Sequence, residues 1–426
     1  MINTSSEETC RAILVGVRLS GDISYSMEEL EGLAEAAGAE VLGHMLQNLD
    51  RPDRATLIGK GKVEELAEMC ANMEADTAIF NDELSGVQLR NLEEQLGVRV
   101  IDRTILILDI FAERAVSGEG KLQVELAQLQ YRLPRLSGFG KSLSRLGGGI
   151  GTRGPGEKKL ETDRRHIAKR MDEIKSEIVK LRNSRNVQRS KREKSEIPVV
   201  ALVGYTNSGK SAIMNRLLSI TEKSEKSVYE EDMLFATLDT AQRNIRFNDN
   251  NEFVLIDTVG FVSKLPHSLI DAFKATLEEV AYADLLLHIV DVSYENSDFQ
   301  IEVTEQVLKE IGAGDKEKLV VYNKTDLLLK ENEATVGIIG PSGPECVFVS
   351  AKTGFGIDLL VEKIKDKIFT GKVKTMFLIP YSKGDISSYI CDKAEVFSLN
   401  YTENGALINA EVTGADYNRL KQYEQI

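Results

Sequence analysis

The chain has 426 residues, of which 42% are hydrophobic and 28% are charged, and its formal net charge is −14. Charges interrupt the apolar runs as in folded globular proteins, and because a single core rarely grows past about 250 residues we expect two to four domains. No stretch reaches the ~18 apolar residues of a membrane span, and the start lacks a basic segment followed by an apolar one, so the sequence predicts neither export nor membrane insertion.

The first predicted domain, an α/β fold, spans residues 1–115. Short apolar runs typical of strands alternate with helix-like stretches, the strands at 12–17, 77–80 and 98–101 and the helices at 27–37 and 84–96. Such alternation is the pattern of an α/β domain. Gly59-Lys60-Gly61-Lys62 lacks a complete phosphate loop, so we interpret it as a turn that caps a helix.

Residues 116–196 are predicted to form a helical hairpin arm. Apolar side chains recur at helical spacing in two stretches, first Leu122, Leu126, Leu129 and Leu133, then Ile167, Met171, Ile174, Ile178 and Leu181. Both stripes are narrow, which favours two helices packed against each other as an antiparallel pair. Because proline cannot continue a helix, we expect Pro134 to end the first one.

A glycine-rich, basic loop is predicted between the two helices, at 134–159. It holds eight glycines and the basic residues Arg135, Lys141, Arg145, Arg153, Lys158 and Lys159. Residues 158–194 carry fourteen Lys or Arg against six Asp or Glu, a net of +8 that leaves −22 for the rest of the chain. A basic patch in an acidic protein points to a directed contact with an anionic partner such as structured RNA. The alternatives are a connector loop and a solvated helix face.

Residues 197–370 are predicted to form a P-loop GTPase domain with a mostly parallel, doubly wound sheet. Its first strand leads into the pattern GxxxxGK[ST], formed by Gly204, Tyr205, Thr206, Asn207, Ser208, Gly209, Lys210 and Ser211, and a helix-like stretch follows. Backbone N–H groups of such a loop hold phosphates, Lys210 neutralises the β- and γ-phosphates, and the Ser211 hydroxyl binds Mg²⁺.

Two further segments are predicted to respond to the γ-phosphate. Asp257-Thr258-Val259-Gly260 follows a strand, where Asp257 can hold Mg²⁺ through a water and the Gly260 N–H can meet the γ-phosphate. In Phe235-Ala236-Thr237-Leu238-Asp239, Thr237 is the candidate second Mg²⁺ hydroxyl, with a plain strand-start threonine as the alternative. We therefore predict Mg²⁺ on Ser211, Thr237 and Asp257, and catalytic roles for Lys210, Thr237 and Gly260.

Two segments at later strand ends predict selection of guanine. Asn323-Lys324-Thr325-Asp326 follows one strand, and the Asp326 carboxylate can accept hydrogen bonds from N1–H and the 2-amino group, which adenine does not present together. The Lys324 stem is long enough to lie along the base. Ser350-Ala351-Lys352 follows another strand, with the Ala351 N–H toward the guanine O6. Because each motif stands at a strand end, GTP and GDP are the predicted ligands.

The residue after Gly260 predicts slow hydrolysis. Ras-like GTPases place there a glutamine that orients the attacking water, whereas this chain has Phe261, whose ring cannot hydrogen-bond water. We expect slow intrinsic turnover that a partner stimulates. Asn207 is a candidate ligand for a K⁺ ion near the phosphates, with an ordinary loop asparagine as the alternative.

With these residues in hand, the chain resembles the HflX family of GTPases over most of residues 10–370. Beyond the nucleotide motifs the resemblance rests on stretches at 59–66, 82–95, 100–104, 120–127 (GKLQVELA) and 147–157 (GGGIGTRGPGE). It implies a protein that binds the large (50S) ribosomal subunit and its rRNA through the N-terminal domain, the arm and the glycine-rich loop, and that splits or rescues stalled ribosomes. Residues 371–426, predicted as a small C-terminal α/β domain, carry no motif that assigns a role.

Three alternatives stay open: a ribosome-assembly GTPase, a signalling switch with a protein partner, and a nucleotide-regulated scaffold without useful turnover. We expect a monomer. The cytoplasm is the expected compartment because Cys10, Cys70, Cys346 and Cys391 show neither disulfide nor zinc spacing, and the four histidines show no metal-ligand spacing. The basic arm leaves room for a weak peripheral membrane contact, although no lipid-anchor motif is present.

Overall fold

The computed structural model describes residues 10–135, 155–193, 197–220, 235, 241–247, 251–264, 277, 279–331 and 346–425. Contacts divide the chain into two compact units. The first comprises Met1–Gln188, Glu231–Asp239 and Val262–Thr276, and the second comprises Arg189–Glu230, Thr240–Phe261 and Leu277–Ile426. No helix in the described ranges is long and apolar enough to cross a membrane.

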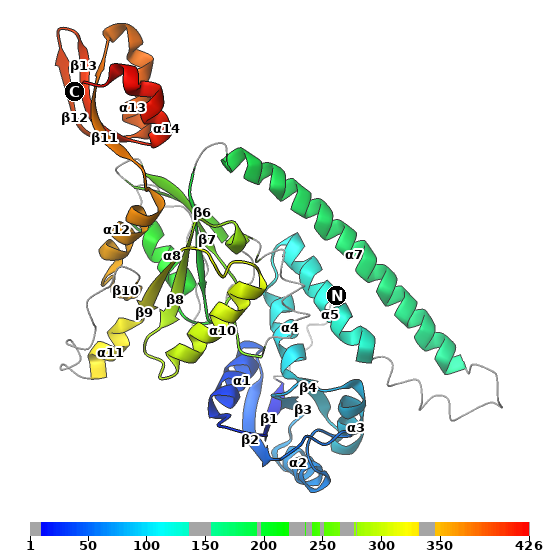
Figure 1. Ribbon diagram of the computed structural model, residues 1–426. Coiled ribbons are helices and arrows are strands. Elements are labelled where there is room, and N and C mark those ends of the chain that lie inside the picture. Colours follow the sequence, from blue (N-terminus) through cyan, green and yellow to red (C-terminus); the bar gives the residue numbers. More distant parts are fainter. Residues whose placement is uncertain are drawn as a thin grey trace, which may run out of the picture. The chain divides into compact units, whose positions relative to one another are not determined.

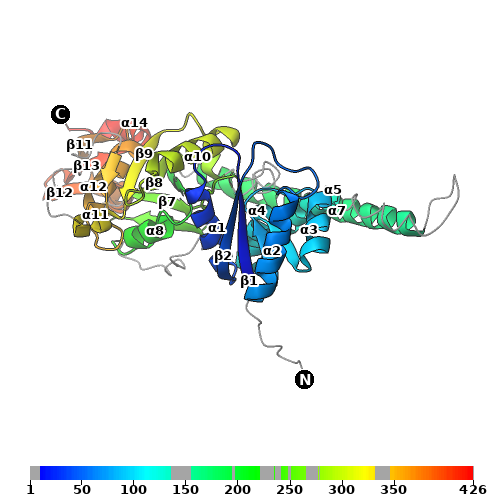
Figure 2. The same cartoon turned by 90° about the horizontal axis from the view of Figure 1, so that it is seen from below.

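A four-stranded parallel sheet forms the centre of the first unit. Its strands are β1 (Arg11–Arg18), β2 (Glu40–Asn48), β3 (Thr77–Phe80) and β4 (Arg99–Asp102), in the order β2-β1-β3-β4. β1 pairs with β2 on one side and β3 on the other, and most of its residues are buried, as in the interior of a parallel sheet (Figure 2). The predicted α/β fold of this region is confirmed, whereas β2, an edge strand, is absent from the prediction.

Four helices cover this sheet. They are α1 (Ser24–Ala36), α2 (Lys60–Met73), α3 (Gly86–Leu96) and α4 (Arg103–Arg114). α2 and α3 share an apolar core with the strands, while α1 and α4 pack together and against β1 and β3. α4 begins directly after β4, because Asp102 ends the strand and also caps the helix, its carboxylate accepting from the Ile105 N–H at 3.0 Å.

Helices α5 (Gly118–Arg135) and α7 (Pro155–Glu193) form the predicted arm, and α7 is the longer of the two (Figure 1). The buried centre of their contact is Leu126, Met171 and Ile174, flanked by Leu122, Leu129, Leu133, Ile167 and Ile178. Arg170 adds two hydrogen bonds of 2.8 Å to Glu125 across the pair. The predicted packing of the two apolar stripes is therefore confirmed except at Leu181, which is exposed.

Two boundaries of the arm differ from the prediction. Pro134 lies inside α5, which continues to Arg135; so close to the helix end, the missing N–H removes one hydrogen bond and the helix tolerates it. α7 begins at Pro155, inside the predicted 134–159 loop, because proline suits the first helical position, where no N–H is needed. Residues 136–154 of that loop lie outside the described residues.

A six-stranded sheet forms the centre of the second unit. Its strands are β5 (Val199–Gly204), β6 (Ala241–Arg246), β7 (Glu252–Asp257), β8 (Leu285–Asp291), β9 (Lys318–Asn323) and β10 (Cys346–Phe348). They run in the order β10-β9-β8-β5-β7-β6 and are parallel except for β6 at one edge. The predicted doubly wound sheet is confirmed. Such a sheet binds ligands at the carboxyl ends of its strands, where the predicted motifs stand.

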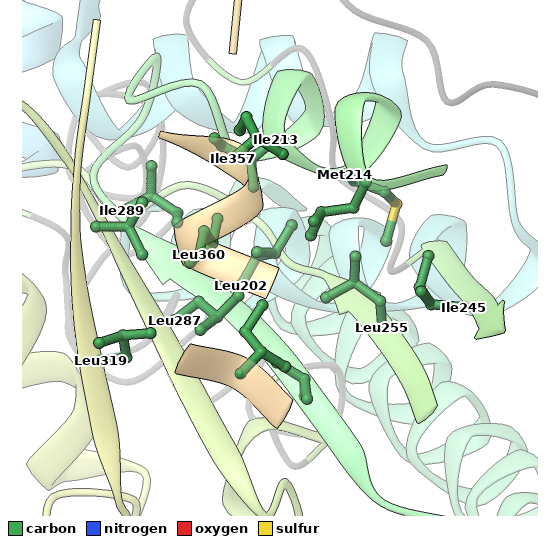
Figure 3. Packing of buried hydrophobic residues seen from close by; sticks show 14 of the residues in the cluster. Leu202, Ile213, Met214, Ile245, Leu255, Leu287, Ile289, Leu319, Ile357 and Leu360 are labelled. Atoms are coloured by element: carbon green, nitrogen blue, oxygen red, sulfur yellow. The ribbon is translucent and has the colours of Figure 1, made fainter. Parts of the chain in front are cut away.

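Helices flank this sheet. They are α8 (Lys210–Leu218), α10 (Ser297–Glu310), α11 (Thr325–Glu331) and α12 (Ile357–Ile368). α8 and α12 share one buried cluster with the strands, and α10 packs against β5 and β8. In Figure 3, Ile213 of α8 and Ile357 of α12 lie close to each other above Leu202 of β5. This packing anchors the helix that begins at Lys210 to the strand that ends at Gly204.

A three-stranded antiparallel sheet follows at the end of the chain. It consists of β11 (Val373–Ile379), β12 (Glu395–Thr402) and β13 (Gly405–Val412), in the order β11-β13-β12, with helices α13 (Gly384–Lys393) and α14 (Gly414–Leu420). Phe377, Ile390 and Ile408 are central to its own apolar core. The small α/β fold predicted for residues 371–426 is confirmed.

Candidate functional site

The loop between β5 and α8 has the backbone of a phosphate-binding loop. Gly204 has φ +147° and Gly209 has φ +90°, values that side-chain-bearing residues rarely adopt. A Cβ at Gly204 would lie 2.2 Å from the Ile289 carbonyl oxygen, and one at Gly209 would lie 2.2 Å from the Asn323 amide nitrogen. Both glycines are therefore required by conformation and by space.

Lys210, the first residue of α8, points back into this loop. Its buried ammonium donates hydrogen bonds to the carbonyl oxygens of Tyr205, at 2.7 Å, and Gly204, at 3.2 Å. Burial lowers the pKa of Lys210 to about 8, a shift that the carboxylate of Asp257 opposes. The positive charge is thus held at the loop by weak acceptors that a phosphate group can replace.

Ser211 and Asp257 meet beside the loop. The Ser211 hydroxyl donates to Asp257 Oδ2 at 2.6 Å, and Asp257, at the end of β7, is fully buried. Burial raises the pKa of Asp257, and its Oδ1 has no hydrogen-bond partner among the described residues. These hard oxygens fit Mg²⁺. Among the described residues no three or more His, Cys, Asp or Glu side chains are grouped so that they could hold a metal ion, so hydroxyls, water and phosphate would complete the shell.

The segment after Asp257 lies against the same loop. Thr206 N–H donates to the Phe261 carbonyl at 2.6 Å, and Phe261 N–H donates to the Gly204 carbonyl at 3.1 Å. A Cβ at Gly260 would lie 2.6 Å from Thr206 Cα and 3.1 Å from the Lys210 ammonium nitrogen. The Gly260 backbone therefore adjoins the loop and its lysine, as a γ-phosphate contact requires, while the Phe261 ring is buried.

The predicted base-binding motifs come together through one amide. Asn323 Nδ2–H donates to the Ser208 carbonyl at 3.0 Å, and its Oδ1 accepts from the Ala351 N–H at 3.0 Å. The Ser350 hydroxyl donates to Asp326 Oδ1 at 2.6 Å and orients that carboxylate. Phosphate loop, Asn323–Asp326 segment and Ser350–Lys352 segment are thus joined by short hydrogen bonds.

The sequence analysis did not identify Asp291 as part of this site. The Lys324 ammonium lies 2.9 Å from Asp291 Oδ2, and Lys324 has φ +65°. Asp291 ends β8 directly opposite Asn323 in the β8–β9 register, so it belongs to the same strand edge. Its position at the end of a strand could have indicated a role in the site, although Asp291 belongs to no motif.

The Phe235–Asp239 segment is described only at Phe235. Phe235 belongs to the first unit, where its ring packs edge-on against Phe111 of α4, with centroids 4.7 Å apart. Ala236, Thr237, Leu238 and Asp239 lie outside the described residues. The predicted Mg²⁺ contact of Thr237 stays a prediction.

Three family profiles match this chain in consecutive regions. The profile described as "GTP-binding GTPase N-terminal" matches residues 24–112, and "GTP-binding GTPase Middle Region" matches residues 114–192. The profile described as "50S ribosome-binding GTPase" matches residues 199–324. The third match contains the phosphate loop and ends at Lys324.

Curated relatives match nearly the whole chain. The GTPase HflX of Caldanaerobacter subterraneus subsp. tengcongensis is 49% identical over 414 residues, covering 97% of this chain and 93% of the relative. The GTPase HflX of Escherichia coli is 39% identical over 416 residues, covering 97% of this chain and 96% of the relative. A crystal structure of a GTP-binding protein from the archaeon Sulfolobus solfataricus in complex with GDP is 25% identical, with a TM-score of 0.43, covering 84% of this chain and 98% of that one.

Proposed function

This chain belongs to the HflX family of GTPases, and from that membership we propose that it is a cytoplasmic, ribosome-associated GTPase switched on by the large ribosomal subunit. The observation that carries the nucleotide site is the Asn323 amide, which bonds both the phosphate loop and the Ala351 loop. That bridge leaves Asp326 held by Ser350 beside the site, where its carboxylate can accept from guanine N1–H and the 2-amino group.

Phosphate binding follows from the same geometry. Lys210 exchanges two backbone carbonyls for the β- and γ-phosphate oxygens, and loop N–H groups at the start of α8 supply further donors. Ser211 and Asp257 would hold Mg²⁺, which when bound neutralises charge that develops on the phosphates. Gly260, beside Lys210, is placed for a backbone contact with the γ-phosphate.

Hydrolysis in the isolated protein is proposed to be slow. The buried Phe261 ring occupies the position of the water-orienting glutamine and offers no hydrogen-bonding group. A partner that orders this segment, or that adds a polar group, would accelerate the reaction. Asn207 of the phosphate loop, with φ +56°, is a candidate K⁺ ligand. Comparing GTP turnover in KCl and in NaCl tests that role.

The partner we propose is ribosomal RNA of the large subunit. Support comes from the description "50S ribosome-binding GTPase" of the matching profile and from the net charge of +8 over residues 158–194. Lys175 and Lys180 are exposed on α7, where phosphate contacts would be unobstructed. The protein would act on the ribosome as a monomer that splits or rescues stalled particles.

Cosedimentation with purified large subunits tests this proposal. Binding should be strong with a nonhydrolysable GTP analogue and weak with GDP. Lys175→Glu should lower binding several-fold and more at low salt, because a phosphate contact becomes a repulsion. Lys309→Glu, on the exposed surface of α10, is the matched control and should bind normally. Equal binding in both nucleotides would leave the protein-partner alternative standing.

A further inference from the structure

The backbone of Lys324 is fixed in an uncommon conformation by its neighbours. Its φ is +65°, in the left-handed region that residues with a side chain seldom adopt. On one side, the Asn323 side chain bonds both the phosphate loop and the Ala351 N–H. On the other side, the Thr325 N–H and hydroxyl donate to the Val349 carbonyl oxygen at 3.3 Å and 2.9 Å. These hydrogen bonds set the point from which the Lys324 side chain leaves the backbone.

The ammonium at the other end of this side chain is bound by Asp291, the last residue of β8. The two charged groups are 2.9 Å apart, and only 24% of the lysine side chain and 15% of the aspartate side chain are exposed. β8 and β9 are neighbours in the sheet (Figure 1), and Asp291 stands directly opposite Asn323. The ion pair therefore lies at the strand edge from which the segment with Asp326 continues.

Asp291 is itself held in place. The Ser293 N–H and hydroxyl donate to Asp291 Oδ1 at 3.0 Å and 2.6 Å, which leaves Oδ2 for the ammonium of Lys324. The Val292 N–H donates to the Asn323 carbonyl oxygen at 3.1 Å and joins this turn to the neighbouring strand. Each carboxylate oxygen thus has its own partner, and the turn orients the carboxylate toward the lysine.

Because its backbone and its ammonium are both held, the four-carbon stem of Lys324 follows a defined path. A lysine side chain that is free in solution populates many rotamers, and ordering it when a ligand binds costs free energy. A stem that is already ordered can lie along a flat ring without that cost. The base contact proposed for Lys324 is a contact of this kind.

We propose that Asp291 is a positioning residue for guanine-nucleotide binding, which holds the Lys324 ammonium so that the stem is ordered against the face of the base. The inference rests on the proposed base contact of Lys324. Asp326 recognises the edge of guanine, whereas the Asp291–Lys324 pair acts on the ring face, which other purines also present. The first residue therefore sets specificity, and the ion pair sets affinity.

A double-mutant cycle of Asp291→Asn and Lys324→Met tests the proposal. The asparagine amide can still accept from the Ser293 turn but has no charge for the ammonium, and methionine keeps an apolar stem without the charge. Asp291→Asn alone should lower GDP affinity about three- to tenfold, because the stem must then be ordered on binding. In the Lys324→Met background the same substitution should change GDP affinity by less than about twofold. The loss should appear in KM for GTP rather than in kcat, because the base takes no part in phosphate cleavage.

Glu305→Gln is the matched control for the loss of an ion pair. Glu305 pairs with Lys318 at 2.7 Å, and the two side chains are 27% and 25% exposed, so this pair is similar in length and in burial. Lys318 begins β9 and Asn323 ends it, so the control pair lies at the opposite end of the same strand. Its GDP affinity should equal that of the wild type.

The same measurements can overturn the proposal. A higher GDP affinity in Asp291→Asn would mean that the nucleotide must break the ion pair in order to bind. An equal loss in the Lys324→Met background would show that Asp291 does not act through the lysine, and a lowered Tm with normal GDP affinity would show a structural role alone. The base site is tested separately by Asp326→Asn. If that variant still prefers guanine to xanthine, the proposed base site fails, whatever the result for Asp291→Asn.

Discussion

Each of the two larger sheets has a strand that is followed by a helix with glycine and lysine at its start, but the two helix starts differ in backbone geometry and in charge. At β5–α8 the glycines have positive φ and press against Ile289 and Asn323, and Lys210 is buried. At α2, Gly61 has open space around the position of a Cβ, and Lys60 is largely exposed beside Glu64. Lys62 forms an ion pair with Glu65 at 2.7 Å.

The difference between the starts of α8 and α2 shows that a phosphate-binding loop depends on backbone geometry and on an unneutralised lysine as well as on glycine and lysine content. The α2 lysines are neutralised by glutamates of their own helix, and Gly59 N–H donates to the Gln47 side chain at 2.9 Å. Lys210 instead donates to backbone carbonyls and lies near the buried carboxylate of Asp257, so its charge remains available for phosphate. The interpretation of Gly59–Lys62 as a turn and helix cap is confirmed, since Gly59 is the N-cap of α2.

The largest expected effect comes from Asp326→Asn. An amide can no longer accept both guanine donors, but its NH₂ group can donate to the C2 carbonyl of xanthine. Two charge-assisted hydrogen bonds of about 1.5–3 kcal/mol each predict at least a hundredfold loss of GDP affinity and a gain for xanthosine diphosphate. Competition of both diphosphates against a fluorescent nucleotide measures the change. Unaltered preference for guanine would place the base elsewhere.

Next in size is Lys210→Ala compared with Lys62→Ala. We expect the first to weaken GTP binding by about a hundredfold, because a buried ammonium that contacts phosphate is lost. The second removes an ion pair within α2 and should leave nucleotide affinity unchanged. Isothermal titration of both variants with GTP and GDP gives the comparison directly. A comparable loss in Lys62→Ala would mean that the α2 turn also binds nucleotide.

The sequence predicts those parts of the fold and of the site that are marked by a local sequence pattern. The phosphate loop and the strand ends at Asp257 and Asn323 were predictable, because the motif itself demands a strand, a turn and a helix. The sequence analysis did not predict α4, because Asp102 both ends β4 and caps the helix, so no loop separates the two elements. The bonds between Arg103 and Ser263 join residues 160 positions apart, and no local pattern distinguishes such charges from surface ones.

A smaller effect is expected from pH. Burial lowers the pKa of Lys210 from 10.5 to about 8, so the nucleotide-free protein loses this charge as the pH rises above about 8. Phosphates bind the protonated form, so affinity for GDP should be flat below about pH 8 and fall by up to about tenfold per pH unit above it. Binding near pH 8.5 should also take up protons.

Titration in two buffers of different ionisation enthalpy measures that uptake. The sign follows from linkage: the complex holds Lys210 protonated, whereas the free protein at that pH does not. Lys210→Ala is the control and should show no uptake. For the nucleotide-free protein, stability should rise with pH between about 8 and 10.5, where the unfolded chain binds more protons at this residue.

The smallest expected effect contrasts Gly61→Ala with Gly209→Ala. Gly61 lies in the first turn of α2 with nothing within 4 Å of a Cβ, so alanine should raise the free energy of unfolding by about 0.5–1 kcal/mol through its helix propensity. Chemical denaturation followed by circular dichroism measures this gain, and nucleotide affinity should not change. Gly209→Ala should act oppositely, because its Cβ would meet the Asn323 amide at 2.2 Å and break the bridge to Ser208. Opposite signs in the two variants would show that the two glycine–lysine turns differ in backbone geometry, whereas a loss of nucleotide binding in Gly61→Ala would contradict that distinction.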